Sequence, residues 1–538
     1  MFLLKLRQSL FVFEQRRGKR MFKGLLKTFL ALICTTSIAG IVLAKGPPIE
    51  WHKGYGTDSE EHVHEGFQTS DGGYLGIGQT FEPRSSFTDI LIVKLDANGD
   101  LDWQQIIGSN GVHDVGIAGD EVNDGYIVGG GLHVGTQQRS LVKLDFGGNI
   151  VWQKSYPHAG HGAIRGIAID DDGGIVTTGY IDSDQPGYLF IADEADGFIM
   201  KSNQDGDLLW DRGISATQGA KVLKDPNSGG FAIVTTVWVF DEHDHQDVRL
   251  IVTDGDGVEL WSNDYGGSED DQCFDLDATS DGGYVCAGHT KSFGVANWDY
   301  YLLKIGQDGS EEWYRTFGQP RGYDPNYIHD EAYGVRQTPE GGYIVAGGSG
   351  DEYPYSESGH SAGPSDEWKA YLVKTDAQGN PQWEAVYGEA GAGHNAAEYV
   401  GLTVDGDLIV FTDTDSQMPP QPNNFGFMKL DQSIRCSVKL DSTVGGDSFN
   451  FQTSFIRYRP DDSPVDYWVE VHGPSEYRDL SFVRKRSAPL AKRVGRTNGY
   501  TILEGESGDY VLSLYVGTYP DQVECESAAV YQLNSARD

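Results

Sequence analysis

Short runs of alternating apolar and polar residues, separated by glycine-rich turns, fill most of the chain. Residues 69–78 read Thr-Ser-Asp-Gly-Gly-Tyr-Leu-Gly-Ile-Gly, and the pattern returns at 279–288 and 338–347. Glycine adopts positive φ without steric cost, so the Asp-Gly-Gly core is a tight turn between two strands. Alternation with period two directs one face of each strand toward a core. The pattern therefore predicts antiparallel β-hairpins.

A second sequence motif completes the repeated unit. Residues 92–103 read Ile-Val-Lys-Leu-Asp-Ala-Asn-Gly-Asp-Leu-Asp-Trp, and 141–152 and 372–383 follow the same plan. Its Asp-x-x-Gly segment predicts another hairpin turn, and its Trp falls on the last strand, where the ring can seal one unit against the next. Each unit then has four strands. The Trp recurs at this point along the chain: Trp51, Trp103, Trp152, Trp210, Trp261, Trp313 and Trp383.

Units of about fifty to seventy residues with four strands each are typical of β-propeller blades. Seven units are indicated by glycine turns near Asp71, Asp124, Asp172, Gly229, Asp281, Glu340 and Asp405. The seventh lacks its own Trp strand, whereas the segment 49–56 before the first unit resembles such a strand. We expect this N-terminal strand to complete the last blade, closing a seven-bladed β-propeller over residues 48–433.

The repeat ends before Cys436. Strand-like runs at 466–471 and 509–516 predict a small Ig-like β-sandwich over residues 436–538, so the fold class is all-β. A basic stretch at 484–496 lies between these strands and is either a solvated loop or a docking surface for the propeller or an anionic glycan.

Four cysteines follow the N-terminal region. Cys273 and Cys286 fall on the two arms of one predicted hairpin, and Cys436 and Cys525 bracket the C-terminal region. Two disulfides, formed in an oxidising compartment, account for this arrangement.

Residues 1–44 have the plan of a signal peptide with an N-terminal extension. A basic segment at 21–27 precedes an apolar run that ends with small residues at Val42 and Ala44. We expect cleavage there, with a retained membrane anchor as the alternative, and no other segment could span a bilayer. The predicted location is secreted, periplasmic or at the cell surface, as a monomer.

The chain is strongly acidic, with a formal net charge of −39. Such a surface repels nucleic acids and anionic membranes, and we exclude both as partners of the propeller. A glycan or a cell-surface protein remains as the expected partner.

Loop length distinguishes the two faces of the predicted disc. The Asp-Gly-Gly and Asp-x-x-Gly turns share one face and are short, whereas long connections occupy the other: 180–196, 237–247, 289–298, 350–368 and 413–425. Variable loops on a rigid scaffold are the usual place for binding and catalysis. Most of the fourteen histidines map to these connections, many beside acidic residues, although both residue types are also tolerated in polar loops.

An acid–base site can be assembled from these loops. His113 and His133 both belong to the second unit, at the long-loop face, and a tyrosine and an arginine could join them from nearby segments. Two histidines and a tyrosine could abstract and return a proton beside an acidic sugar, with the arginine neutralising its carboxylate. The candidates are His113, His133, Tyr188 or Tyr180, and Arg165 or Arg139.

Metal sites are a second possibility. His243 and His245 lie two residues apart and could share a face toward a zinc ion, given a further ligand from elsewhere. The stretches 170–173 and 254–257 are rich in Asp and Gly and could hold calcium, but neither carries the downstream Glu of an EF-hand loop, and both fall at hairpin turns. No cofactor is certain.

Aromatic residues on the same loops offer flat surfaces for sugar rings. The candidate ligand-binding residues are Trp238, Tyr353, Tyr355 and Trp298. Exposed aromatics of this kind can also anchor the loops themselves.

Over residues 50–432, the repeated phrases resemble those of the secreted propeller-repeat proteins of bacteria and archaea. The resemblance implies a closed propeller and export, and it carries no catalytic residues. The turn and Trp are also similar to the docking motif of quinoprotein dehydrogenases, but the adjacent cysteine pair of those enzymes is absent. Ulvan-type polysaccharide lyases are similar in being secreted propellers that use His and Tyr.

Two hypotheses follow. The first is a non-catalytic, secreted binding or scaffold protein that holds a glycan or a protein on its long-loop face. The second is a polysaccharide lyase acting on acidic glycans through His113, His133 and a tyrosine. Convergence of these side chains in one cleft beside an arginine would favour the enzyme.

Overall fold

The computed structural model describes residues 46–432 apart from 193, 241–243, 319, 322–325, 327, 351–367, 389–393 and 415–423. Beyond residue 433 it describes the backbone of seven strands, without their side chains.

The strands of residues 46–432 form seven four-stranded antiparallel sets, each in chain order except the last. We number these sheets along the chain. The first three contain β2 (Glu61–Gln68), β3 (Tyr74–Phe81), β4 (Thr88–Leu95), β5 (Leu101–Ile107); β6 (Val115–Val122), β7 (Gly125–Val134), β8 (Thr136–Leu144), β9 (Ile150–Ser155); and β10 (His161–Ile169), β11 (Ile175–Ser183), β12 (Asp196–Ser202), β13 (Leu208–Gly213).

The fourth to sixth sheets follow the same plan. They contain β14 (Lys221–Lys224), β15 (Phe231–Val239), β16 (His245–Thr253), β17 (Glu259–Tyr265); β18 (Asp275–Ala278), β19 (Tyr284–Thr290), β20 (Asp299–Ile305), β21 (Glu311–Phe317); and β22 (His329–Gln337), β23 (Tyr343–Gly350), β24 (Lys369–Thr375), β25 (Pro381–Tyr387).

The seventh sheet joins the two ends of the repeat region. It contains β26 (Asn395–Leu402), β27 (Leu408–Thr414) and β28 (Asn424–Leu430), and its fourth strand is β1 (Ile49–Tyr55). β1 pairs antiparallel with β28, from Ile49 opposite Leu430 to Tyr55 opposite Phe425. The prediction that the N-terminal strand completes the last sheet is confirmed. One parallel bridge, Lys369 to Asn395, also links the sixth and seventh sheets.

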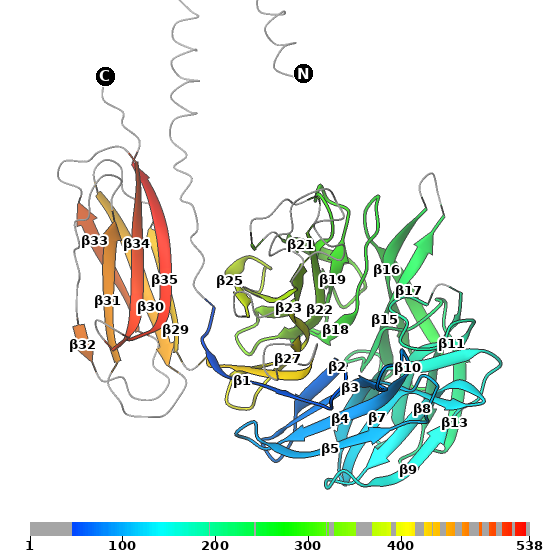
Figure 1. The fold of residues 1–538 in the computed structure, drawn as a ribbon. Helices are drawn as coiled ribbons and strands as arrows, with labels where there is room; N and C mark the ends of the chain where they lie inside the picture. Colours follow the sequence, from blue (N-terminus) through cyan, green and yellow to red (C-terminus); the bar gives the residue numbers. More distant parts are fainter. Residues whose placement is uncertain are drawn as a thin grey trace, which may run out of the picture.

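The first strands of the sheets surround a central channel. Each contacts the first strand of the next sheet, in the order β2, β6, β10, β14, β18, β22 and β26, and β26 contacts β2. The sheets therefore close a ring, whose colours run from blue to yellow in Figure 1. The connections between second and third strands lie on one face, here called the long-connection face. The turns between first and second strands lie on the other, the short-turn face.

Tryptophan and glycine join neighbouring sheets at the rim. The glycine of each Asp-x-x-Gly turn has positive φ, +75° at Gly99 and +78° at Gly148. A Cβ atom on Gly148 would lie 2.7 Å from the ring of Trp103 in the sheet before it. Likewise, a Cβ atom on Gly99 would lie 2.9 Å from the ring of Trp51 in β1. The predicted sealing role of Trp is confirmed, and the closing strand takes part in it.

A lysine on the third strand explains the acidic residue of the Asp-Gly-Gly turn. Lys94, 1% exposed, lies with its ammonium 3.0 Å from Asp71. The fourth sheet has Val252 at the lysine position and Ser228 where Asp71 stands in the first turn, which supports this pairing role. Equivalent pairs recur around the ring: Lys143–Asp124, Lys201–Asp172, Lys304–Asp281, Lys374–Glu340 and Lys429–Asp405.

The C-terminal strands form two further sheets. One has the order β29 (Ile434–Asp441), β30 (Ser448–Arg457), β33 (Val494–Thr501), and the other β32 (Arg484–Arg486), β31 (Val465–His472), β34 (Gly508–Thr518), β35 (Gln522–Leu533). β29 of one sheet contacts β34 and β35 of the other.

One predicted disulfide is present. Cys273 and Cys286 are bonded in the fifth sheet, with their Cα atoms 6.2 Å apart. The side chains of Cys436 and Cys525 lie outside the described part of the structure, so that pairing stays a prediction. Among the described residues no helix is long and apolar enough to cross a membrane.

Candidate functional site

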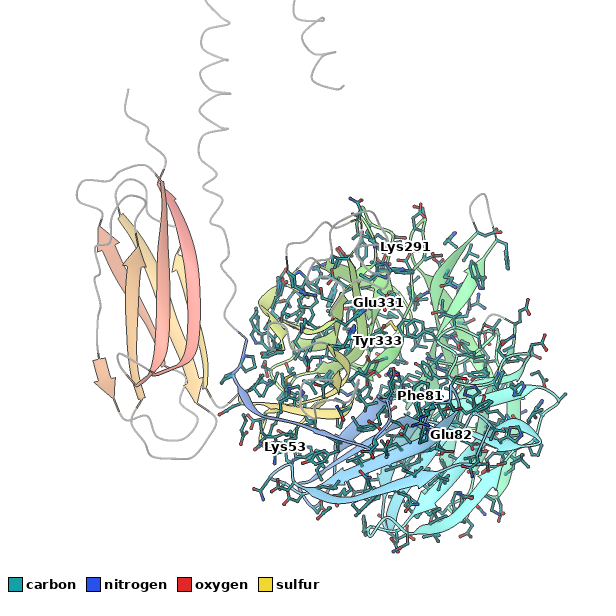
Figure 2. The ribbon with its side chains drawn as sticks, viewed as in Figure 1. Lys53, Phe81, Glu82, Lys291, Glu331 and Tyr333 are labelled. Atoms are coloured by element: carbon teal, nitrogen blue, oxygen red, sulfur yellow. A yellow bond between two sulfur atoms is a disulfide. The ribbon has the colours of Figure 1, made fainter. Side chains whose placement is uncertain are left out.

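The connection between β11 and β12 folds inward and caps the central channel on the long-connection face. Tyr188 of this third-sheet segment stacks on His64 of the first sheet, with ring centroids 4.3 Å apart and planes at 13°. Phe190 contacts Phe274 of the fifth sheet at 4.4 Å and Tyr333 of the sixth at 5.8 Å. The segment therefore spans the ring, and Figure 2 marks Tyr333 near its centre.

Arg165 holds this cap in place. Its Nη1 donates to the carbonyl oxygens of Leu189 and Phe190, at 2.9 and 2.6 Å, and to Gln218 Oε1 at 3.0 Å. Its Nη2 lies 3.5 Å from the Tyr188 hydroxyl, and the residue is 6% exposed. The structure thus brings two predicted site residues, Arg165 and Tyr188, together. Burial raises the pKa of Tyr188.

His113 precedes β6 and His133 lies near the end of β7, on the same face. Both flank Asp114, whose carboxylate accepts from the backbone N–H groups of His133 (2.5 Å) and Ser109 (2.7 Å). Burial raises the pKa of Asp114, although these bonds oppose the shift. The ring of His113 contacts Phe87, with centroids 5.1 Å apart. Asp114 therefore binds the backbone of His133, and the ring of His113 lies 3.4 Å from the Thr88 hydroxyl, whereas Arg165 and Tyr188 share the cap.

Other predicted candidates in this region have structural partners. Tyr180 is fully buried and donates to the carbonyl of Gly187 at 3.0 Å, inside the cap segment. Arg139 forms an ion pair with Asp211 of the third sheet and donates to the carbonyl of Tyr156 at 3.2 Å.

Beneath the cap, charged side chains meet across the channel. Lys221 of the fourth sheet lies 2.8 Å from Glu65 of the first and donates to the Tyr399 hydroxyl of the seventh at 2.9 Å. Arg336 of the sixth sheet pairs with Asp275 of the fifth at 2.6 Å. Burial alone would lower the pKa of Lys221, but the Glu65 carboxylate raises it above its ordinary value. A small cavity of about 50 Å³ remains among these groups.

Two histidines near the channel are neutral at physiological pH. Burial lowers the pKa of His64 to about 3 and that of His289 to about 4. His289 is 2% exposed and packs among Phe274, Phe190 and Trp298. Both rings therefore serve as aromatic packing surfaces here, and neither gains a proton near pH 7.

The metal candidates have other partners or lie outside the described residues. His243 is not described, and His245 lies 3.6 Å from Asp247. Asp170 pairs with Lys201, and Asp254 accepts backbone N–H groups of its own turn. Within the described ranges, no three His, Cys, Asp or Glu side chains are grouped so that they could hold a metal ion.

The aromatic candidates differ in exposure. Trp238 and Phe240, at the end of β15, stack with ring centroids 6.4 Å apart and planes at 18°, and they are 38% and 79% exposed. Trp298 is half-buried, with the Lys291 ammonium 4.3 Å from its ring centroid. Tyr353 and Tyr355 lie outside the described residues.

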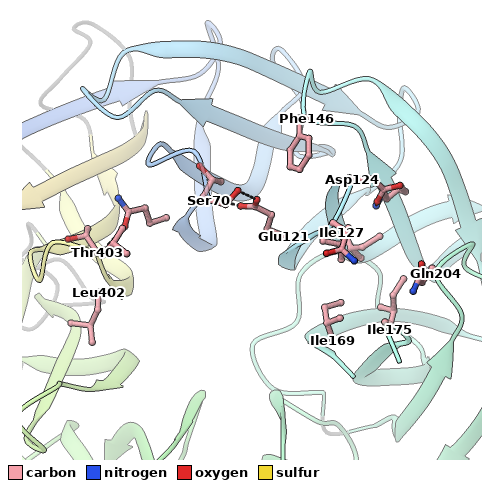
Figure 3. A pocket seen from close by; sticks show the side chains of 17 residues that line it. Ser70, Glu121, Asp124, Ile127, Phe146, Ile169, Ile175, Gln204, Leu402 and Thr403 are labelled. Carbon is pink, nitrogen blue, oxygen red and sulfur yellow. Dashed lines mark hydrogen bonds and ion pairs between the residues drawn. The ribbon is translucent and has the colours of Figure 1, made fainter. Parts of the chain in front are cut away.

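The pattern of the sequence did not predict a hollow on the short-turn face. About 820 Å³ opens on the short-turn face, lined by the turns of the first, second, third and seventh sheets (Figure 3). These turns are far apart in the sequence, and closure of the ring of sheets places them around one hollow. The local signal for it is an apolar residue, Ile169 or Leu402, where the first and sixth sheets have Gln68 and Gln337.

The closed ring of four-stranded sheets makes this chain a β-propeller protein. No protein-family model and no curated protein matches its sequence. In structure the chain is similar to Pyrococcus horikoshii acylaminoacyl peptidase, at 11% identity and a TM-score of 0.35, over 73% of this chain and 57% of that one. It is also similar to Sqt1 from Chaetomium thermophilum, at 10% identity and a TM-score of 0.32, over 78% and 96% of the two chains. This chain thus spans little more than half of the peptidase, and neither likeness assigns it an activity.

Proposed function

We propose that this is an exported binding protein that holds a glycan on its long-connection face. In this proposal a seven-bladed propeller over residues 48–433 carries the site, and an Ig-like β-sandwich over 436–538 is a separate domain. The protein acts as a monomer in the periplasm, in the medium or at the cell surface, after removal of residues 1–44.

The stacked pair of Trp238 and Phe240 is the observation that carries the proposal. Large aromatic rings are normally buried, yet Phe240 is 79% exposed and lies nearly parallel to Trp238. Two rings in similar planes offer a flat apolar platform for the C–H face of a sugar. The pair sits at the end of β15, beside the connection to β16, on the face where loop variation costs the scaffold little.

Charge favours a neutral glycan over a polyanionic one. The formal net charge of −39 repels uronate and sulfate groups, most strongly at low salt. A stacking platform needs no charge on the ligand.

Affinity for polysaccharides tests the proposal. Isothermal titration of the full chain with soluble β-glucan, xylan, mannan and alginate should give binding to a neutral polymer. The Trp238→Ala/Phe240→Ala double variant should lose about tenfold or more of that affinity. Val134→Ala is the matched control, since Val134 is 59% exposed on the same face. Equal affinities of the double variant and the control, or no binding to any of these polymers, would refute the platform.

The lyase alternative has less support. Such an enzyme needs an arginine free to neutralise a substrate carboxylate. Arg165 is 6% exposed, and one of its nitrogens already serves three acceptors. Absorbance of unsaturated products during incubation with alginate and other acidic polysaccharides would revive this alternative.

A further inference from the structure

The hollow of about 820 Å³ on the short-turn face is far from the aromatic platform and has a chemistry of its own. It opens between the turns that join the first and second strands of four sheets, as Figure 3 shows. Its volume falls within the range of about 300–1,000 Å³ that is usual for ligand pockets.

Two residues that line the hollow cannot accept a hydrogen bond that joins other neighbouring sheets on this face. In three sheets, a residue just before the turn between first and second strands accepts a backbone N–H from the turn of the preceding sheet. Three such bonds are present: Ser70 to Glu121 (2.7 Å), Ser280 to Gln337 (2.7 Å) and Val404 to Gln68 (2.8 Å). The third and seventh sheets have Ile169 and Leu402 at this position. A hydrocarbon side chain cannot accept a hydrogen bond. Both residues line the hollow.

The charged side chains of the wall already have partners within it. Both oxygens of Glu121 accept from Ser70, and Asp124 pairs with Lys143. The apolar groups are not covered in this way, since Phe146 is 48% and Val404 92% exposed. The hollow therefore offers exposed apolar side chains beside carboxylates that already have partners, which favours an apolar group of the occupant at Phe146 and Val404.

Charge limits what can accompany the apolar group. Among the lining residues, one positive charge (Lys143) stands against two negative ones (Glu121 and Asp124), a sum of −1. The chain as a whole carries −39. The negative charge of the protein would repel the carboxylate of a fatty acid. It would attract Lys or Arg side chains that flank an apolar group in a peptide.

We propose that this hollow docks a peptide segment of a partner protein, with apolar side chains inside the hollow and basic residues beside the Glu121 and Asp124 carboxylates. The assignment is independent of glycan binding, because it concerns the opposite face and different residues. Loss of one activity by substitution therefore leaves the other measurable.

Fluorescence anisotropy of labelled hexapeptides with the full chain tests the proposal. The probe is Lys-Lys-Leu-Leu-Lys-Lys, and the comparison peptides replace both leucines by serine or all four lysines by glutamate. The basic apolar peptide should bind at least tenfold more tightly than either. Its affinity should fall as salt rises, because part of the attraction is electrostatic. Equal binding of the serine peptide, tighter binding of decanoate, or no binding of the probe would overturn the proposal.

Two substitutions localise the binding. Phe146→Ala removes a half-exposed ring and should lower the affinity for the probe peptide about tenfold without unfolding the chain. Ile169→Gln introduces the acceptor found at Gln68 and Gln337 and should narrow the hollow, with a similar loss. Leu260→Ala, at a residue 54% exposed on the outer strand β17 of the fourth sheet, is the matched control and should bind normally. Unchanged affinity in both hollow variants would place the peptide elsewhere and contradict the assignment.

Discussion

Substituting Gly148 by alanine tests how neighbouring sheets dock. Gly148 has φ of +78°, a conformation that costs an L-residue about 1–2 kcal/mol. The new Cβ would also lie 2.7 Å from two atoms of the Trp103 ring, so the ring or the turn must move. Overpacking of this kind costs about 1–3 kcal/mol. The expected loss in the free energy of unfolding is therefore about 2–5 kcal/mol.

Gly406→Ala separates the two contributions. Gly406 has φ of +86°, but a Cβ atom there would meet nothing within 4 Å. This control should lose only the backbone term of about 1–2 kcal/mol. The difference between the two variants then measures the contact with Trp103.

Urea unfolding followed by tryptophan fluorescence and circular dichroism is the appropriate assay. Both variants should shift the midpoint at an unchanged slope, which keeps the comparison in terms of free energy. Adding Trp103→Leu to Gly148→Ala should cost less than the sum of the single losses, since the clash is then relieved. Equal losses for Gly148→Ala and Gly406→Ala would refute the proposed docking of Trp on glycine.

Two further predictions concern buried charges. Lys221→Met leaves the Glu65 carboxylate unpaired in the channel, and we expect a loss of about 3–5 kcal/mol in urea unfolding, largely restored by adding Glu65→Leu. His62 joins the first and seventh sheets: burial alone would lower its pKa, but Asp413 and Glu60 raise it well above 6.5. A raised folded-state pKa contributes stability that is fully present below about pH 6.5 and is lost as the pH rises through the folded value. Unfolding midpoints of the wild type should thus approach those of His62→Gln at alkaline pH, and a constant gap from pH 6 to pH 10 would contradict this.

Much of the fold could be predicted because its signals are local. The turn at Asp71-Gly72-Gly73 needs positive φ, and Gly72 has +84°. The orphan strand around Trp51 could be placed because it matched the last strand of the other units, and it pairs with β28 as expected. The Lys94–Asp71 ion pair was also within reach, since both residues recur in the repeated phrase.

The centre of the ring could not be predicted in the same way. Glu65 and Lys221 belong to sheets that are three apart along the chain, and only closure of the ring brings them to 2.8 Å. Tyr188 and Arg165, two residues of the predicted set, lie 3.5 Å apart, whereas the role of that set stays a prediction. What Arg165 does, however, depends on the Leu189 and Phe190 carbonyls of the cap, whose course no periodic pattern encodes.

Closure of the ring by strands from opposite ends of the repeat is tested most directly by hydrogen–deuterium exchange of the full chain. β1 is the outer strand of its sheet, so only about alternate amides of residues 49–55 bond to β28, whereas the amides of 424–430 bond to strands on both sides. The bonded amides of both peptides should be protected, and the two peptides should lose that protection together in rising urea. Exchange of 49–55 within seconds, while 424–430 stays protected, would show that β1 does not close the ring.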